Sequence, residues 1–182
     1  MARGGFHRDK GYKGRGHPIM FGFKEALHFG PFPDGGGYPK TFLKHAFATL
    51  GVDDPDHVVH LCSGSMLTGI RVDVRPEMKA DYVEDCRHTS LPSGRFRYVM
   101  ADPPYSEDYA NSLYRTRDSY PTPYEIMKEA CRLLVVGGRF GILHFQIPTT
   151  QRLPMKILGV WGITQGPGFN IRAWSVFEKA SR

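Results

Sequence analysis

The strongest constraint on the fold of this chain is an apolar run that ends in two consecutive prolines. Residues 96–101, Phe-Arg-Tyr-Val-Met-Ala, have the composition of a β-strand, and Asp102, Pro103, Pro104 and Tyr105 follow. Each proline fixes its own φ and lacks an N–H, so the strand stops and the turn is stiff. An acid here lies at the carboxyl edge of a sheet, beside the flat face of a tyrosine. Such a pocket accepts hydrogen bonds from an exocyclic amino group; the alternative is a rigid turn with no binding role.

Length and composition fit one domain. The chain has 182 residues, 41% hydrophobic and 13% aromatic, which is enough for a single core. Its apolar runs are short and its N-terminus is polar, so we expect neither a transmembrane helix nor a secretory signal. Three cysteines (Cys62, Cys86 and Cys131) and eight histidines show no zinc-type spacing. We therefore expect free thiols, no metal and a cytoplasmic protein.

The positive charge is concentrated in residues 1–18, which we interpret as a flexible basic arm preceding a single domain over 19–182. This segment is rich in glycine and has almost no aliphatic side chains, so it cannot bury a core. Five basic side chains and one acid give it four of the six net positive charges of the chain. It either binds the phosphates of a nucleic acid or is a solvated tail. The basic side chains are Arg3, Arg8, Lys10, Lys13 and Arg15.

The first half of the domain alternates strands with unusually short connections. A loop rich in glycine and proline precedes a helix predicted at Lys40–Leu50, where apolar residues recur at helical spacing. Strands are predicted at Val58–Cys62, Ile70–Val74 and Ala80–Cys86. Only seven residues separate the first two strands and five the next two, whereas a parallel crossover normally needs a dozen or more. We expect the helices of this half to be single turns or missing.

The second half follows a regular order of helix and strands. Thr122 and Pro123 are typical of a helix start, and the apolar spacing predicts a helix over Tyr124–Leu134. Gly137 and Gly138 are expected to end it through a left-handed turn. The last two strands are separated by a glycine-rich turn and form a predicted hairpin. Strands are predicted at residues 139–145, 153–164 and 170–179.

The motif at 102–105, with a strand and small-residue turn about forty residues before it, resembles the S-adenosylmethionine-dependent amino-methyltransferases of the Asp-Pro-Pro-Tyr type. That family methylates adenine N6, cytosine N4 or glutamine side-chain nitrogen, and the resemblance covers roughly residues 38–179. It implies an α/β, Rossmann-like class I methyltransferase sheet, mostly parallel with an antiparallel C-terminal hairpin, here with shortened helices in the first half. It also implies S-adenosylmethionine as cofactor and Asp102, Pro103, Pro104 and Tyr105 as catalytic residues.

The resemblance assigns a cofactor loop to the turn after the first of these strands. In the family this loop usually reads x-Gly-x-Gly, and here Cys62, Ser63, Gly64 and Ser65 stand there, with only Gly64 clearly matched. Small residues let backbone amides approach a ligand closely. Upstream, Tyr38 and Lys40 are expected to contact the methionine part of the cofactor, although packing is an alternative role for them.

Three acids complete the expected cofactor site. Asp73 closes the strand at 70–74, where the resemblance implies a carboxylate that accepts from both ribose hydroxyls. Asp85, with Cys86 beside it, is expected to accept from the adenine amino group, and Asp102 is expected to border both cofactor and substrate. For Asp73 and Asp85 the alternative is a surface or turn carboxylate.

The expected substrate is an exocyclic amine, in particular adenine N6 of DNA or RNA. Residues 106–120 are expected to lie over the pocket, and Arg115 and Arg117 in this segment suit contacts to nucleic acid. No segment remains for a target-recognition domain, so a protein partner or a homodimer is expected to supply recognition. His144 is expected to line the cleft without a catalytic role.

Two other classes of function remain open. The chain is alternatively a methyltransferase for small molecules or protein nitrogens, in which case the basic arm is dispensable. It is alternatively a non-catalytic module that binds S-adenosylmethionine or nucleic acid, since the glycine loop departs from the family pattern.

Overall fold

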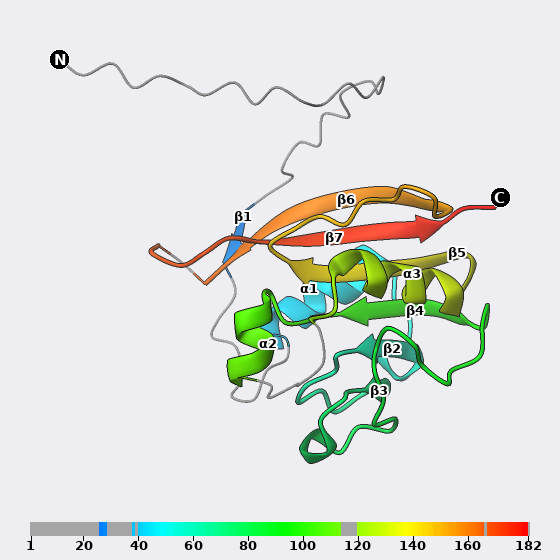
Figure 1. The fold of residues 1–182 in the computed structure, drawn as a ribbon. Helices are drawn as coiled ribbons and strands as arrows, with labels where there is room; N and C mark the ends of the chain where they lie inside the picture. Colours follow the sequence, from blue (N-terminus) through cyan, green and yellow to red (C-terminus); the bar gives the residue numbers. More distant parts are fainter. Residues whose placement is uncertain (1–25, 29–37, 39, 114–119, 166, 182) are drawn as a thin grey trace, which may run out of the picture.

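The fold is organised around one seven-stranded sheet, shown in Figure 1. The computed structural model describes residues 26–28, 38, 40–113, 120–165 and 167–181. The sheet order is β1-β6-β7-β5-β4-β2-β3. In chain order the elements are β1 (Ala26–His28), α1 (Lys40–Leu50), η1 (Pro55–His57), β2 (Val58–Leu61), β3 (Ile70–Val72), η2 (Pro76–Met78), β4 (Phe96–Ala101), α2 (Glu107–Leu113), α3 (Pro123–Leu133), β5 (Leu134–His144), β6 (Met155–Thr164) and β7 (Arg172–Lys179).

Strand directions match the predicted class. Strands β3, β2, β4 and β5 run parallel to one another, while β7 is antiparallel to both β5 and β6. The chain therefore has the Rossmann-like methyltransferase sheet with an antiparallel C-terminal hairpin, as predicted. Within the described residues, no helix is long and apolar enough to cross a membrane.

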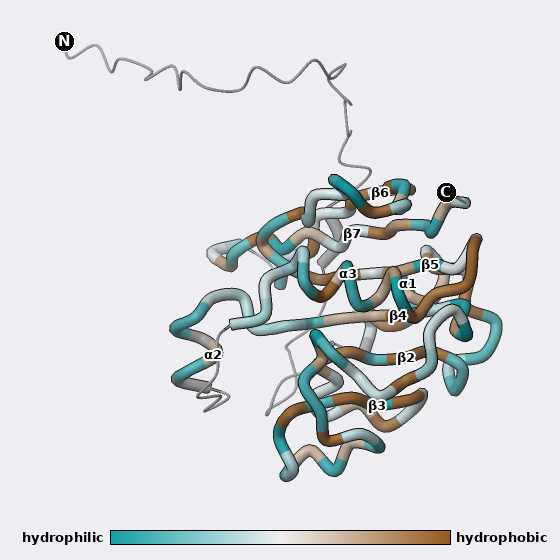
Figure 2. Tube along the Cα trace, turned by 45° about the vertical axis from the view of Figure 1, so that its right-hand side comes forward, coloured by the Kyte–Doolittle hydropathy of each residue, from teal (hydrophilic) through white to brown (hydrophobic). Residues whose placement is uncertain are grey.

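Two apolar clusters lie on opposite faces of the sheet, because side chains alternate along each strand. Val58 and Met100 belong to the cluster under α1, whereas their neighbours Val59 and Val99 belong to the cluster under α3. Figure 1 shows α1 and α3 on the two sides of the sheet, and Figure 2 shows apolar residues on the inner strands with a hydrophilic α2 at the edge. Burying both faces fits the near-continuous apolar runs of the parallel strands.

Side-chain hydrogen bonds hold both of the helices that cover the sheet. Helix α3 begins with a capping box, in which Thr122 Oγ1 accepts from the Glu125 N–H and Glu125 Oε2 accepts from the Thr122 N–H. Helix α1 is tied to the sheet by Trp174 Nε1, which donates to Thr49 Oγ1 at 2.9 Å. Both predicted helices are confirmed, α1 with the predicted bounds and α3 one residue earlier at each end.

The predicted strand over residues 80–86 is wrong. Only Tyr82 forms a bridge there, with Val72, and the single turn η2 is the only helical segment among the described residues between β3 and β4. The prediction of shortened helices in this half is therefore confirmed. The apolar residues that suggested a strand are exposed, Val83 at 50% and Tyr82 at 36%, so the pattern did not report burial.

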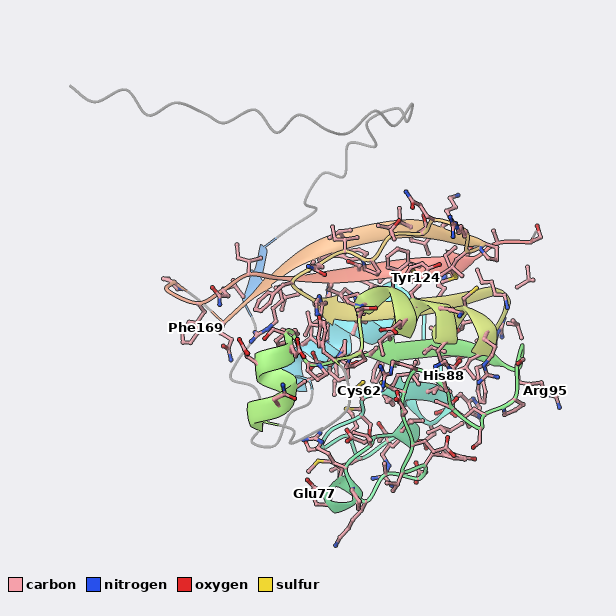
Figure 3. All side chains as sticks on the ribbon, viewed as in Figure 1. Cys62, Glu77, His88, Arg95, Tyr124 and Phe169 are labelled. Atoms are coloured by element: carbon pink, nitrogen blue, oxygen red, sulfur yellow. The ribbon has the colours of Figure 1, made fainter. Side chains whose placement is uncertain are left out.

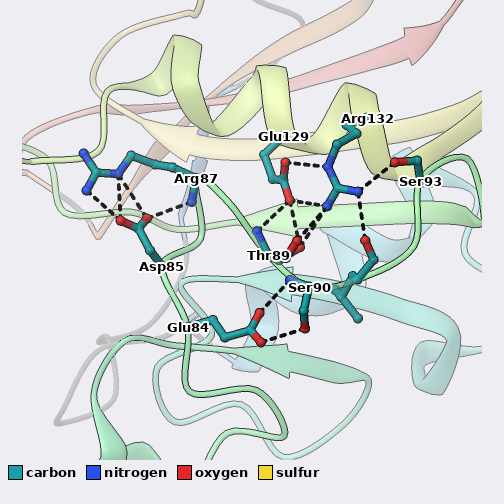
Figure 4. A network of polar contacts seen from close by, with 9 residues as sticks. Glu84, Asp85, Arg87, Thr89, Ser90, Ser93, Glu129 and Arg132 are labelled. Atoms are coloured by element: carbon teal, nitrogen blue, oxygen red, sulfur yellow. Dashed lines mark hydrogen bonds and ion pairs between the residues drawn. The ribbon is translucent and has the colours of Figure 1, made fainter.

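Polar contacts to α3 take the place of the missing secondary structure, as Figure 4 shows. Glu129 Oε1 accepts from the Thr89 N–H and hydroxyl and from Arg132 Nη2, and Glu129 Oε2 accepts from Arg132 Nε. Arg132 also donates to the carbonyls of Leu91 and Thr89 and to Ser93 Oγ. This network anchors an irregular segment that has few apolar contacts of its own.

Three further features differ from the prediction. Gly137 and Gly138 lie inside β5, because α3 already ends at Leu133; the left-handed turn exists at Gly137 (φ 78°) but forms an irregularity in the pairing of β5 with β4. Helix α2 occupies the start of the expected loop over residues 106–120. Strand β1 pairs with β6 in parallel and was not predicted.

We expect Glu129→Gln to destabilise the fold by about 2–4 kcal/mol, since it removes the charge that Arg132 and Thr89 bond while leaving those donors in place. Glu129 is only 5% exposed. Burial by itself raises the pKa of Glu129, but the bonds from Arg132 and Thr89 outweigh it and leave this pKa below its usual value. Urea unfolding at neutral pH measures the loss.

The matched control is Glu84→Gln, a carboxylate in the same segment that accepts only from Ser90 at the surface. It should change the free energy of unfolding much less than Glu129→Gln. Equal losses for the two variants would show that the buried network does not anchor the segment.

Candidate functional site at the carboxyl edge of the sheet

Strand register brings the predicted catalytic motif beside the predicted cofactor loop. Leu61 of β2 pairs with Ala101 of β4, and Ala101 pairs with Ile142 of β5. The residues that leave β2 and β4 at this edge are therefore Cys62 and Asp102, and β5 ends two residues later at His144. Figure 3 shows Cys62 at the end of β2 and Phe169 on the β6–β7 hairpin. The carboxyl edge of an open α/β sheet is where such folds bind ligands.

Asp102 and Tyr105 form one unit. The stiff turn returns the tyrosine toward the strand end, and Tyr105 Oη donates to Asp102 Oδ1 at 2.7 Å. Burial raises the pKa of Asp102 to about 7, against the opposing effects of the Tyr105 hydroxyl and the Arg172 guanidinium. The carboxyl group thus changes charge near neutral pH, and such a perturbed acid at a sheet edge is typical of a functional site.

Arg172 and Phe145 pack against the Tyr105 ring beside this carboxyl group. The guanidinium carbon of Arg172 lies 4.9 Å from the centre of the Tyr105 ring and 5.8 Å from that of Phe145. Phe145 contacts Tyr105 with ring centres 4.8 Å apart. One face of the Tyr105 ring is therefore covered by Arg172, so at most the other face is open to a planar substrate.

Sequence reasoning missed Arg172. It comes from the first residue of β7, and the antiparallel pairing of His144 with Ala173 carries it to the ends of the parallel strands. A usable signal was present: Arg172 alternates with the buried Trp174 and Val176 along β7, which places all three on one face of the sheet.

Both ring nitrogens of His144 contact neighbouring groups. Its Nδ1 accepts from the Gln146 N–H at 2.9 Å, so the ring proton is assigned to Nε2, which faces Tyr120 Oη at 2.9 Å. Burial lowers the pKa of His144, although the Pro104 carbonyl acts in the other direction. His144 thus links the end of β5 to Tyr120, and its non-catalytic role stays a prediction.

The predicted cofactor loop contains two residues in the left-handed conformation. Cys62 has φ 56° and Gly64 has φ 52°, so a cysteine stands in the left-handed conformation that favours glycine. The Ser63 N–H donates to the Val72 carbonyl at 2.9 Å and the Gly64 N–H to Asp73 Oδ2 at 2.8 Å. The turn is held against the end of β3 by these bonds.

Asp73 is already fully engaged by the protein. The side chain is 4% exposed, and its two oxygens accept from the Gly64 N–H and from the N–H, Nε and Nη2 of Arg75. Four donors use all the acceptor positions of a carboxylate. The position at the end of β3 fits the predicted role, but ribose hydroxyls reach Asp73 only if Arg75 moves.

Asp85 shows the same arrangement. Its carboxylate accepts from the N–H, Nε and Nη2 of Arg87, two residues along, and these bonds hold the pKa of Asp85 below its usual value. An arginine thus follows each of the two predicted cofactor acids at the same spacing. This Asp-x-Arg pattern was visible in the sequence and indicated local pairing.

Several buried polar atoms next to the loop have no hydrogen-bond partner among the described residues: Tyr38 Oη, Ser63 Oγ and both ring nitrogens of His60. Burial, followed by the nearby Asp102 and Cys62, raises the pKa of Tyr38 well above its ordinary value. Burial lowers the pKa of His60 to about 4. Unsatisfied buried groups of this kind fit the polar end of a ligand better than a sealed core.

Some predicted residues lie outside the described part of the chain. These are the arm residues Arg3, Arg8, Lys10, Lys13 and Arg15, together with Arg115 and Arg117; Lys40 is the first residue of α1, and its side chain is not described. Within the described residues no group of three His, Cys, Asp or Glu side chains is placed to hold a metal ion. A separate hollow of about 180 Å³, lined by Arg97 and Arg139 among others, lies at the opposite edge, where β4 begins.

Comparison with solved structures identifies the fold family. TrmN from Thermus thermophilus aligns with 15% identity and a TM-score of 0.56, over 79% of this chain and 50% of TrmN, so this chain spans about half the length of that protein. Geranyl diphosphate methyltransferase, solved with GPP and sinefungin, aligns with 11% identity and a TM-score of 0.54, over 78% of this chain and 79% of the other.

The [4+2]-cyclase SpnF shares the same fold, with 12% identity and a TM-score of 0.51 over 86% of this chain and 88% of SpnF. No protein-family model and no curated protein sequence matches the chain. The comparisons therefore establish the methyltransferase fold, and the presence of a cyclase among the similar structures shows that the fold by itself does not assign the reaction.

We expect Arg172→Met and Tyr105→Phe each to raise the pKa of Asp102 above about 7. Both remove a group that favours the ionised carboxylate, whereas burial, which opposes ionisation, remains. Carbon NMR of the labelled Asp102 carboxyl group over a pH titration measures the change, with Asp102→Asn to assign the signal.

The control is Arg139→Met, since Arg139 contacts the Leu50 carbonyl and Glu178 and not the Asp102 cluster. It should leave the Asp102 titration unchanged. An Asp102 pKa that does not respond to Arg172→Met would remove Arg172 from the site.

Proposed function

We propose that this protein is an S-adenosylmethionine-dependent methyltransferase that acts on an exocyclic amino group, with adenine N6 of DNA or RNA as the favoured target. The observation that carries the proposal is Asp102: a carboxyl group with a pKa near neutrality, set by a double-proline turn at the carboxyl edge of a methyltransferase-type sheet. The resemblance of residues 102–105 to the amino-methyltransferase motif supports the same reaction.

The residues around the turn at Cys62–Ser65 suit the methionine end of the cofactor. Tyr38 and Ser63 present buried hydroxyl groups with no partner in the described chain, and these groups are the ones we assign to the polar end of the cofactor. At the adenosyl end, Asp73 and Asp85 take part only after exchanging their bonds to Arg75 and Arg87. When bound, S-adenosylmethionine supplies an electrophilic methyl group.

Asp102 orients the nucleophile. The lone pair of an aromatic amine is delocalised into its ring, and hydrogen bonds from the NH₂ group to the Asp102 carboxylate and the Pro103 carbonyl favour a more tetrahedral nitrogen. The lone pair then points at the methyl donor, and most of the rate comes from this orientation. The ionised carboxylate accepts better than the neutral acid, so the rate should rise with pH through about 7.

Tyr105 supports Asp102 and borders the substrate. Its hydroxyl bonds the carboxylate, Arg172 lies over its ring, and Phe145 contacts the same ring with centres 4.8 Å apart. Stacking of a base on this aromatic cluster would be worth about 1–3 kcal/mol per base. Phe145 (41% exposed) and Phe169 (60% exposed) add aromatic surface at the same edge. Exposed rings and a guanidinium group near one acid favour an unpaired nucleobase over a small aliphatic amine.

We also propose that a protein partner or a second copy contributes to target recognition, and that the basic arm adds affinity for phosphates. The alternatives are a methyltransferase for small molecules or protein nitrogens and a non-catalytic binding module. The first stays open because a planar amine of any size can donate a hydrogen bond to the Asp102 carboxyl group.

Methyl transfer is tested with labelled S-adenosylmethionine on single-stranded DNA, single-stranded RNA, duplex DNA, small amines and a glutamine peptide. We expect labelled N6-methyladenine in a single-stranded substrate, with the rate rising between pH 6 and pH 8. Asp102→Ala should lower the transfer rate at least about 100-fold while calorimetry shows cofactor affinity nearly unchanged.

Glu107→Ala, which removes an exposed carboxylate at the start of α2, is the control and should keep the activity. Full transfer by Asp102→Ala would exclude the proposed mechanism. Absence of cofactor binding by the unchanged protein would exclude the enzyme and favour the nucleic-acid-binding module.

Neutralising the arm should reduce the salt dependence of nucleic-acid binding. We expect that changing its five basic residues to glutamine reduces the magnitude of the slope of log affinity against log salt, for single-stranded RNA, by about 3. Each basic residue that binds a phosphate releases counterions from the RNA, and the variant lacks these contacts. Fluorescence anisotropy with a labelled oligonucleotide measures the slope. Lys128→Gln with Lys156→Gln, two exposed lysines away from the site, should leave it unchanged; an equal slope for the arm variant would assign the arm a solvating role.

A further inference from the structure

Two cysteines meet at the turn that the proposed function uses. Cys62 Sγ donates to Cys86 Sγ across 2.9 Å, although 24 positions separate the two residues. Cys62 follows β2 and is partly exposed, whereas Cys86 lies in the irregular segment after η2 and is 7% exposed. Both are thiols in this structure.

Hydrogen bonds and an ion pair hold the chain on both sides of the two sulfur atoms. The turn containing Cys62 is pinned by the Ser63 and Gly64 amides, and Cys86 lies between Asp85 and Arg87, whose ion pair at 2.6 Å holds that loop. A disulfide has an S–S length of about 2.05 Å. The remaining difference of less than about 1 Å is within reach of small side-chain rotations.

We propose that Cys62 and Cys86 form a preorganised redox-modification site that a peroxide converts to a disulfide. The thiolate of one cysteine attacks the O–O bond and hydroxide leaves, giving a sulfenic acid. The sulfur of the other cysteine displaces its oxygen as water. Overall, two thiols and one hydrogen peroxide give one disulfide and two waters, with the sulfurs oxidised and the peroxide reduced.

The environment of the pair sets the conditions for this reaction. The hydrogen bond to Cys86, then burial and the nearby Asp73 and Asp102, raise the pKa of Cys62 well above its ordinary value. Since the thiolate is the reactive form, oxidation should be slow at neutral pH and faster in alkaline buffer. The site therefore resists weak oxidants and responds to sustained peroxide.

Oxidation has a consequence that is measurable without any substrate. The bond closes a loop of about 25 residues in the unfolded chain, which reduces its entropy. Because the sulfurs are already adjacent in the folded protein, little strain offsets this gain. We expect the melting temperature to rise by about 5 °C or more on oxidation.

The experiment exposes the full chain to millimolar hydrogen peroxide at pH 8.5, blocks remaining thiols and digests with trypsin without reduction. The expected product joins the peptides 45–71 and 80–87, with a mass two hydrogens below their sum, while peptide 129–132 carries blocked Cys131. The melting temperature rises in the oxidised protein and falls back after reduction.

Three variants make the outcome decisive. Cys62→Ser and Cys86→Ser should each lose the thermal shift, and Cys131→Ser should retain it. Cys62 and Cys86 recovered as blocked thiols after peroxide, a link to Cys131, or a disulfide that lowers the melting temperature would each overturn the proposal. None of these outcomes depends on methyl transfer, so the failure of the proposed function is separately visible.

Discussion

The parallel register of β2, β4 and β5 is the constraint on which the site depends. Because Leu61, Ala101 and Ile142 lie in one row across three strands, each strand delivers its next residues to the same edge. The prolines after Asp102 then stop the chain from continuing past that edge. A register shift of one residue would move side chains from one apolar cluster to the other and would displace Asp102 from Cys62, so the same pairing fixes the hydrophobic core and the site.

Charge at this edge is distributed unequally among the acids. Asp73 and Asp85 are each bonded by an arginine two residues along, and Glu129 is bonded by Arg132. Asp102 instead has a tyrosine hydroxyl and a guanidinium group that lies over the tyrosine ring. Burial raises the pKa of Asp102 in spite of these two groups, whereas the hydrogen bonds from arginine lower the pKa of Asp85 and, together with those from Thr89, that of Glu129. This contrast singles out Asp102 as the acid whose charge is available for chemistry near neutral pH.

The irregular first half is stabilised differently from the rest of the fold. Strands β5, β6 and β7 bury apolar faces, whereas the segment after η2 is anchored by Glu129, Arg132 and Thr89. Hydrogen bonds to buried charges replace the area that a packed helix would bury. Cys62 and Cys86 are in contact across this irregular half of the fold.

The elements with local sequence signals could be predicted before the structure was known. Helical spacing and the Thr122–Glu125 box defined α1 and α3, apolar runs defined β2 and β4, and the Asp102–Tyr105 motif indicated both the class of fold and the candidate site. The strand predicted at 80–86 failed because its apolar residues are exposed, and Gly137 was misassigned because a left-handed glycine fits a strand irregularity as well as a helix end. The Asp-x-Arg spacing at Asp73 and Asp85 was a further local signal, and it indicated that Arg75 and Arg87 pair with these acids. The contact of Arg172 with Tyr105 and that of Cys62 with Cys86 became visible only in the folded protein. Both join residues far apart in the sequence, and no local pattern encodes such contacts.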